Sequence, residues 1–145
     1  MAVLDADGVT VEEGDMLCLH TGFAQLLLDA GDEPDARGLM MSTPALDGRD
    51  PLLQAWIRDS GVATISADNI AVEARPATPA TTPCAALPLH ELCLFRLGVH
   101  LGEMWQLGPL AEWLRANGRS RFLLTAPPLR VPGAVGSPAN GLATV

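Results

Sequence analysis

Three residues between Leu89 and Leu107 carry side chains that could do chemistry: His90, His100 and Glu103. Imidazole nitrogens and carboxylate oxygens are ligands that zinc and manganese accept, and both groups can also transfer protons. Spacing alone makes this a weak signal, because a histidine beside apolar neighbours is more often structural than a ligand. The segment is therefore a candidate site whose geometry depends on the elements around it.

His90 and Glu103 are 13 residues apart, which is too far for one helix face. They could approach each other only if a helix ended between them and the chain returned as a strand. Leu89–Leu97 is apolar on nearly all sides and predicts a buried helix, with Gly98 placed to end it. Val99–Leu101 then predicts a short strand, on which His100 faces opposite to its neighbours, in a packing or solvent-facing position. The break at Gly98 makes convergence of His90 and Glu103 possible.

The rest of the chain alternates helix and strand patterns, which is typical of an α/β domain. Asp47–Gly61 is the clearest pattern: Asp50 can cap a helix, Pro51 suits its first turn, and Gly61 can end it. A β-branched strand follows directly at Val62–Ser66. Short apolar or periodic runs predict the remaining elements: strands at Met16–Leu19 and Phe122–Ala126, and helices at Phe23–Ala30 and Gly108–Gly118. Gly31–Pro44 and the proline-rich Arg75–Pro88 are predicted to be loops.

Polar residues follow two of the predicted strands. His20 closes the first, and Asp68 with Asn69 lies just beyond the strand that starts at Val62. Open α/β sheets tend to place functional loops at these carboxyl ends. The simpler alternatives stay open: His20 can be a histidine at the edge of the core, and Asp68 and Asn69 can be turn formers.

Composition narrows the class of protein. With 145 residues and 48% hydrophobic content, the chain is long enough for one domain with a buried core. A net charge of −8 argues against a nucleic-acid partner, because phosphates favour a basic surface. The three cysteines lack metal-finger spacing, and neither a signal peptide nor an apolar run of membrane-spanning length is visible. We expect a cytoplasmic protein with no membrane partner.

Several blocks, taken in order, resemble the cyclase family, the metal-dependent hydrolases that include bacterial kynurenine formamidase and isatin hydrolase. The blocks are G-D-M-L-C-L-H-T-G-F (14–23), D-N-I-A-V-E (68–73), L-H-E-L with L-G-V-H-L-G-E-M-W-Q-L (89–107), F-L-L-T-A-P-P-L (122–129) and G-A-V-G-S-P-A-N (133–140). The resemblance covers the C-terminal half of that family. It implies an α/β fold of the swivelling β/β/α type, with a mixed sheet and flanking helices, formed by residues 1–145 as a single cyclase-like domain.

The resemblance also implies a metal site. In the family, a histidine and a glutamate that align with His90 and Glu103 lie near the metal centre, as ligands or catalytic groups. An upstream segment, H-x-G-T-H-x-D-x-P-x-H, supplies further ligands there and has no counterpart in this sequence. We therefore expect an incomplete zinc or manganese site, which a homo-oligomer or a missing N-terminal half would complete. Family members usually have arginine at position 20 and often tryptophan at position 23, so the floor of the pocket is expected to differ.

The implied activity is hydrolysis of an amide bond that is not a peptide bond, in an arylformamide or a cyclic amide. The expected partner is this small-molecule substrate. The pocket residues suggested by the resemblance are His20, Phe23, Asp68, Asn69 and Ser137, although the turn at Ser137 is more simply a structural feature that shapes the pocket through its backbone. The alternative is a non-catalytic relative, which keeps the fold for association or ligand binding.

Overall fold

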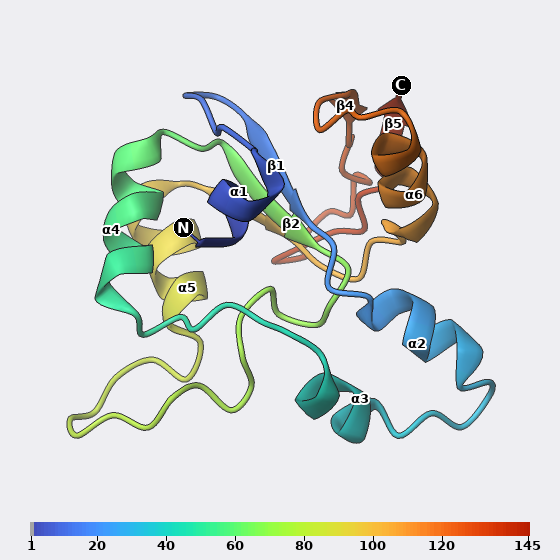
Figure 1. Cartoon of the computed structure of the whole chain (residues 1–145). Coiled ribbons are helices and arrows are strands. Elements are labelled where there is room, and N and C mark those ends of the chain that lie inside the picture. The colour runs from blue at the N-terminus through green and yellow to red at the C-terminus, as the bar shows by residue number, and fades with distance from the viewer. Residues whose placement is uncertain (1) are drawn as a thin grey trace. The chain divides into compact units, whose positions relative to one another are not determined.

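The computed structural model describes residues 2–145, which form two compact units. The N-terminal unit ends at Gly108, and the C-terminal unit is Pro109–Val145. The N-terminal unit contains the elements α1 (Ala2–Asp7), β1 (Met16–Leu19), α2 (Phe23–Asp29), α3 (Ala36–Ser42), α4 (Pro51–Ser60), β2 (Thr64–Ala67), α5 (Pro88–His90), η1 (Glu91–Leu97) and β3 (His100–Gly102) (Figure 1).

A parallel three-stranded sheet is the framework of the N-terminal unit. Its strand order is β1-β2-β3, with Met16 opposite Thr64 and Thr64 opposite His100. Each connection between these strands passes through helix, as parallel pairing requires. The predicted strand at 16–19 has the observed bounds, whereas β2 and β3 begin one or two residues later than predicted.

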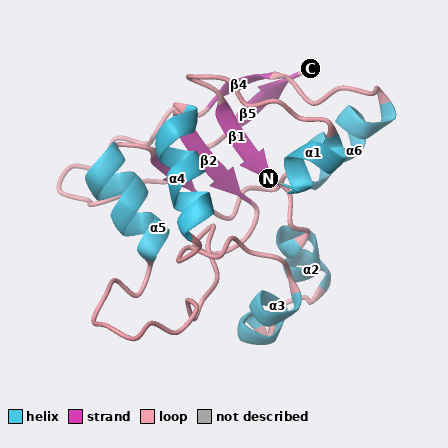
Figure 2. Cartoon of the chain, turned by 60° about the vertical axis from the view of Figure 1, so that its left-hand side comes forward, coloured by secondary structure: helices cyan, strands magenta, loops and turns pink. Residues whose placement is uncertain are grey.

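The core lies between this sheet and the helices α4, α5 and η1. Ile65 and Ala67 of β2 are fully buried and pack with Ile57 of α4, Leu89 of α5 and Cys93 of η1. Figures 1 and 2 show α4 and α5 side by side next to the strands. Their packing against the sheet therefore fixes the position of α5, the helix that carries His90.

The helix α4 begins and ends as its sequence predicts. The Asp50 carboxylate accepts a hydrogen bond from the Leu52 backbone N–H at 2.8 Å, and Pro51 occupies the first turn. Gly61 closes the helix with a φ of 69°, a left-handed conformation that costs glycine little.

The segment Pro88–Leu97 is helical but differs from the expected buried α-helix. It continues from α5 directly into η1, a stretch of π-helix that ends at Gly98, where φ is 72°. Only one side of it is buried. Leu94 and Phe95 are exposed, the latter at 86%, so the prediction of a helix buried nearly all round is wrong. The wider π-helical turn changes which residues face the core, and an all-apolar run cannot reveal this.

The segment Gly31–Pro44 is predicted to be a loop but contains the helix α3. The residue that indicates this helix is Asp35, whose side chain accepts a hydrogen bond from the Gly38 backbone N–H at 3.0 Å and so caps the first turn. The other predicted loop, before Pro88, is observed without regular structure, and it extends away from the sheet in Figures 1 and 2.

The C-terminal unit contains α6 (Gly108–Ala116), β4 (Leu123–Thr125) and β5 (Leu142–Thr144). The helix α6 matches its prediction. The strand predicted at Phe122–Ala126 is observed as β4, but it pairs antiparallel with β5 and leaves Leu123 66% exposed. The prediction that this strand belongs to the core is therefore wrong, because β4 and β5 form a two-stranded sheet of their own.

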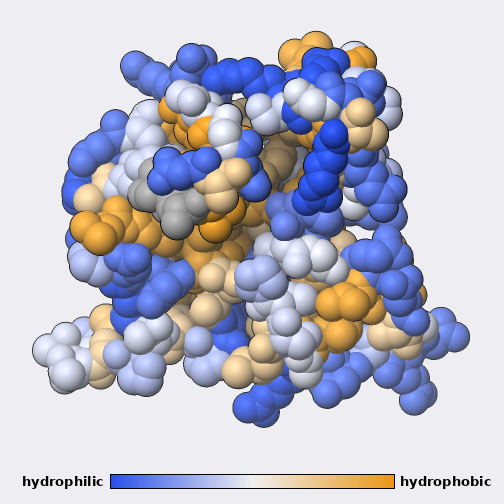
Figure 3. Space-filling view, in the orientation of Figure 1, coloured by the Kyte–Doolittle hydropathy of each residue, from blue (hydrophilic) through white to orange (hydrophobic). Residues whose placement is uncertain are grey.

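Hydrophobic side chains also reach the surface. Orange residues lie among blue hydrophilic ones on the face that Figure 3 shows. The N-terminal unit exposes several large hydrophobic residues, including Val3, Leu28, Met41, Leu52 and Phe95. Among the described helices, none is both long and apolar enough to cross a membrane.

Replacing Ile57 by alanine should destabilise the N-terminal unit by about 2–5 kcal/mol, because this side chain is 1% exposed and its removal leaves a cavity. Leu52→Ala is the matched control on the same helix, since Leu52 is 76% exposed and should cost less than about 0.5 kcal/mol. Urea unfolding followed by circular dichroism measures both. Equal losses in the two variants would contradict the assigned core.

Candidate functional site

The carboxyl ends of the three parallel strands bring the candidate residues to one edge of the sheet. His20 follows β1, Asp68 and Asn69 follow β2, and Glu103 follows β3. Backbone hydrogen bonds tie these ends together: Asp68 N–H donates to Leu19 C=O at 3.3 Å, and Met104 N–H donates to Asn69 C=O at 3.1 Å. The polar residues that follow separate strands in the sequence are thus neighbours in space.

His90 and Glu103 meet at this edge. The ring nitrogen Nε2 of His90 lies 3.0 Å from Oε1 of Glu103, so the reversal at Gly98 brings the two residues together as the sequence allows. The His90 side chain is 23% exposed and that of Glu103 is 36% exposed. Both can therefore be reached from solvent.

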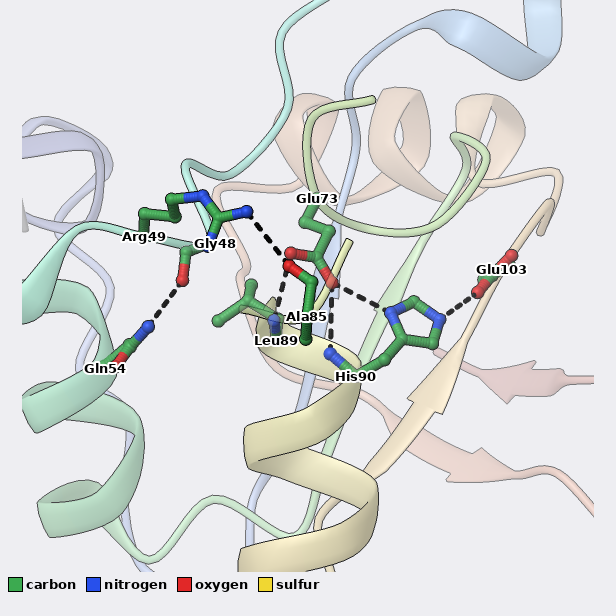
Figure 4. Close-up of polar contacts among 8 residues, drawn as sticks. All are labelled: Gly48, Arg49, Gln54, Glu73, Ala85, Leu89, His90 and Glu103. Carbon is green, nitrogen blue, oxygen red and sulfur yellow. Dashed lines mark hydrogen bonds and ion pairs between the residues drawn. The ribbon is translucent and has the colours of Figure 1, made fainter. Parts of the chain in front are cut away.

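A third residue, Glu73, completes a chain of carboxylate, imidazole and carboxylate (Figure 4). Its side chain is fully buried, and Oε1 lies 2.9 Å from Nδ1 of His90. The same oxygen accepts a hydrogen bond from the His90 backbone N–H at 3.0 Å, and Oε2 accepts one from Leu89 N–H at 3.0 Å. The carboxylate therefore binds the first turn of the helix and the histidine ring together, and its charge suits a helix N-terminus.

The backbone before Glu73 is unusual. Ala71 and Val72 have φ values of 74° and 61°, a left-handed conformation that is rare for non-glycine residues and rarer for a β-branched one. The segment is held by pairing with Leu46, whose N–H donates to Val72 C=O and whose C=O accepts from Ala74 N–H. The surrounding structure thus maintains a strained backbone next to the buried carboxylate.

Gly48 provides the space for that carboxylate. A Cβ at position 48 would lie 2.0 Å from Oε2 of Glu73 and 2.8 Å from the Pro88 ring. The next residue, Arg49, donates to Ala85 C=O at 2.9 Å and contacts Cys84 Sγ at 2.8 Å, which anchors the proline-rich loop. Figure 4 shows both residues beside Glu73.

Asp68 and His20 form a second group. The buried Asp68 carboxylate accepts hydrogen bonds from Thr21 N–H, Thr21 Oγ1 and Gly22 N–H, all at 2.7–2.8 Å, and His20 Nε2 lies 4.0 Å from it. These bonds hold the turn between β1 and α2, which is what a turn-forming aspartate does. Phe23, at the start of α2, is fully buried.

Asn69 is 4% exposed, and its side-chain N–H donates to Pro44 C=O at 3.4 Å. Its Oδ1 is buried without a hydrogen-bond partner among the described residues. A cavity of about 190 Å³ lies beside it, lined mainly by Met40, Met41, Ile70, Glu73 and Arg75. Asn69 thus lies on a small, largely apolar cavity that shares Glu73 with the His90 cluster.

His100 and Ser137 are the two remaining candidates. His100 is exposed on β3, which is the solvent-facing one of the two positions predicted for it. Ser137 is exposed in the C-terminal unit, where its Oγ donates to Pro138 C=O at 3.4 Å.

Glu73 is the member of this cluster that the sequence pattern does not single out. It belongs to the D-N-I-A-V-E block, in which the pattern indicates no role for it. The available signal was a lone carboxylate directly after Ile70, Ala71 and Val72, since a charge in an apolar run is rarely buried without a partner.

The donor set around His90 suits a divalent metal in type and spacing. Two donor atoms bound to one zinc or manganese ion at about 2.0–2.2 Å, with an angle of about 90–110° between them, lie about 2.8–3.6 Å apart. The 3.0 Å between His90 Nε2 and Glu103 Oε1 falls within that range, and Nδ1 already has the carboxylate partner that metal-bound histidines usually have. Within residues 2–145, however, no group of three potential ligands is arranged to hold a metal. The described residues therefore provide two candidate ligands where a catalytic zinc site needs three.

Comparison with known proteins gives a match among solved structures. A crystal structure described as that of a novel cyclase matches this chain with 33% sequence identity and a TM-score of 0.76. The match covers 99% of this chain and 44% of that protein, so the chain spans less than half of the protein it matches. No family model matches, and neither does any curated protein. The match confirms the predicted α/β fold class and supports the resemblance to the cyclase family. Where a mixed sheet is predicted, the structure has a parallel three-stranded sheet with flanking helices and a separate antiparallel pair.

The cysteines near the site should differ in reactivity. Burial, and secondarily the charge of Glu73, raises the pKa of the Cys93 thiol from its usual 9.0 to about 11, and burial raises that of Cys18 to about 11. At pH 8 only about one in a thousand of these thiols is ionised, and the thiolate is the reactive form. Cys84, by contrast, is exposed.

Iodoacetamide at pH 8 should therefore label Cys84 first in the folded protein, and Cys84→Ser should remove the rapid labelling. Cys84 and Cys93 lie on the same tryptic peptide, so fragmentation of that peptide by tandem mass spectrometry identifies the modified residue. Labelling in urea provides the control in which all three thiols react. Cys93 labelling in the folded protein as fast as Cys84 would contradict its burial.

Proposed function

We propose that this chain is part of a cyclase-family, metal-dependent hydrolase that acts on a non-peptide amide bond, in an arylformamide or a cyclic amide. The observation that carries the proposal is the 3.0 Å approach of His90 Nε2 to Glu103 Oε1, at the two positions that the resemblance assigns to the metal centre. The similarity to a novel cyclase over nearly the whole chain supports it.

His90 and Glu103 would hold the metal through Nε2 and Oε1. A bound zinc or manganese ion would supply a water of lowered pKa and would polarise the amide carbonyl. Glu103 would bind the metal or orient the His90 ring at its exposed side, while Glu73 would accept a hydrogen bond from Nδ1–H at the buried side. If His90 acts instead as the base, Nε2 takes the proton and the carboxylates on both sides stabilise the resulting imidazolium.

The remaining ligands would come from residues outside these 145 or from a second copy of the chain. This part of the proposal follows from the two-ligand cluster and from the 44% of the matched protein that the chain spans. We further propose that the protein works in the cytoplasm, either as a homo-oligomer or together with the N-terminal part of the fold. The exposed large hydrophobic side chains of the N-terminal unit are compatible with such association.

A non-catalytic role is the second candidate. The observation that favours it is the lack of a three-ligand group among the residues that the structure describes. A protein of this kind would keep the fold and the buried Glu73–His90 pair for association or ligand binding. Metal binding separates the two candidates.

Titration calorimetry with zinc and with manganese should show a site with a Kd on the order of micromolar in the unaltered protein. His90→Ala and Glu103→Ala should each abolish that binding, because each removes one of two protein ligands. His100→Ala is the matched control, since this exposed histidine lies three residues before Glu103 and should leave the titration unchanged. Absence of binding, both alone and with an added N-terminal part, would exclude the hydrolase proposal and favour the non-catalytic one.

A further inference from the structure

We propose that Glu73 is a positioning residue that keeps the proton of the neutral His90 imidazole on Nδ1, and so leaves the lone pair of Nε2 free at the side of Glu103. This inference rests on the proposed function for its purpose, because a metal ligand needs that lone pair. Its physical content is a tautomer, which can be measured without any metal.

The first argument is a competition between two carboxylates for one proton. A neutral imidazole has a single N–H, which can point to Glu73 through Nδ1 or to Glu103 through Nε2. The Glu73 side chain is fully buried, whereas that of Glu103 is 36% exposed and can be solvated by water. A hydrogen bond to a buried charge is the stronger of the two, so the proton should stay on Nδ1.

The second argument is the way in which Glu73 binds His90. One oxygen, Oε1, accepts from the His90 backbone N–H at 3.0 Å and lies 2.9 Å from Nδ1 of the same residue's ring. The other oxygen is fixed by Leu89 N–H at 3.0 Å, which prevents the carboxylate from turning. The ring is thereby held in one orientation, with Nε2 directed to the exposed side (Figure 4).

A helix cap alone would not require this arrangement. The residue at the cap position, Leu87, makes no side-chain cap, and a short polar side chain there would satisfy the same N–H groups. The chain instead uses a carboxylate from a distant segment, delivered by two left-handed non-glycine residues and accommodated by Gly48. The contact to Nδ1 is the feature that this arrangement adds.

The test is the tautomer of His90 in protein labelled with ¹⁵N-histidine, measured by long-range ¹H–¹⁵N correlation at alkaline pH where the spectrum no longer changes. His20→Gln and His100→Gln assign the three rings. The unaltered protein should show the Nδ1–H form in excess over the Nε2–H form, because the carboxylate at Nδ1 is the buried one of the two acceptors. A predominant Nε2–H form in the unaltered protein would overturn the proposal, and this result needs no variant to fold.

Glu73→Gln should lower the ratio of Nδ1–H to Nε2–H at least about tenfold, because the amide keeps the size of the side chain but replaces one acceptor oxygen with a donor. Glu103→Gln, the control on the other ring nitrogen, should leave Nδ1–H predominant. A ratio that stays the same in Glu73→Gln would show that this carboxylate is only a cap, and would overturn the proposal.

Zinc titration of the same proteins separates this inference from the proposed function. Glu73→Gln should weaken zinc binding about 10–100-fold, as the loss of a partner to a metal-bound histidine does. An unaltered affinity in Glu73→Gln would overturn the positioning role. If the unaltered protein binds no zinc, both alone and with an added N-terminal part, but holds His90 as Nδ1–H, the metal-dependent function fails while the tautomer assignment stands.

Discussion

The arrangement of the candidate site depends on one buried carboxylate. Glu73 accepts two backbone hydrogen bonds and contacts Nδ1 of His90, and these three contacts join the segment after β2 to the start of the helix at Pro88 and to the His90 ring. Burying an unpaired carboxylate would cost several kcal/mol, so these partners are required for the fold as well as for the site. Stability and chemistry share the same contacts here, and a change at Glu73 affects both.

The parallel sheet supplies the other half of the arrangement. Because β1, β2 and β3 run in the same direction, the residues that follow them collect at one edge, and the helix that carries His90 begins at that edge. Asp68 organises the first of these turns, and Glu103 comes directly after the last strand. His90 and Glu103, the proposed metal ligands, lie on or next to the ends of a helix and a strand, and such elements hold side chains more precisely than loops do.

The sequence predicts the regular elements and the meeting of His90 with Glu103 well, since capping residues such as Asp50 and the break at Gly98 are local signals. It does not predict the role of Glu73, because that depends on positive φ values at Ala71 and Val72 and on the space at Gly48, which come from distant pairing. It also misplaces Phe95, because the shift to π-helical geometry is decided by packing. Hydrophobicity patterns alone therefore gave the wrong exposure for both Phe95 and Leu123.

Both carboxylates that flank His90 lie next to a non-glycine residue in the left-handed conformation: Val72 precedes Glu73, and Met104, with a φ of 59°, follows Glu103. Glycine would relax the backbone at either position. Met104 is 44% exposed, so a search for thermostable variants would select Met104→Gly and would enrich proteins whose Glu103 is held less firmly. Val72 is 1% exposed in the core, where the cavity left by glycine would outweigh the relief of strain. Screening such libraries by melting temperature alone would select against the site.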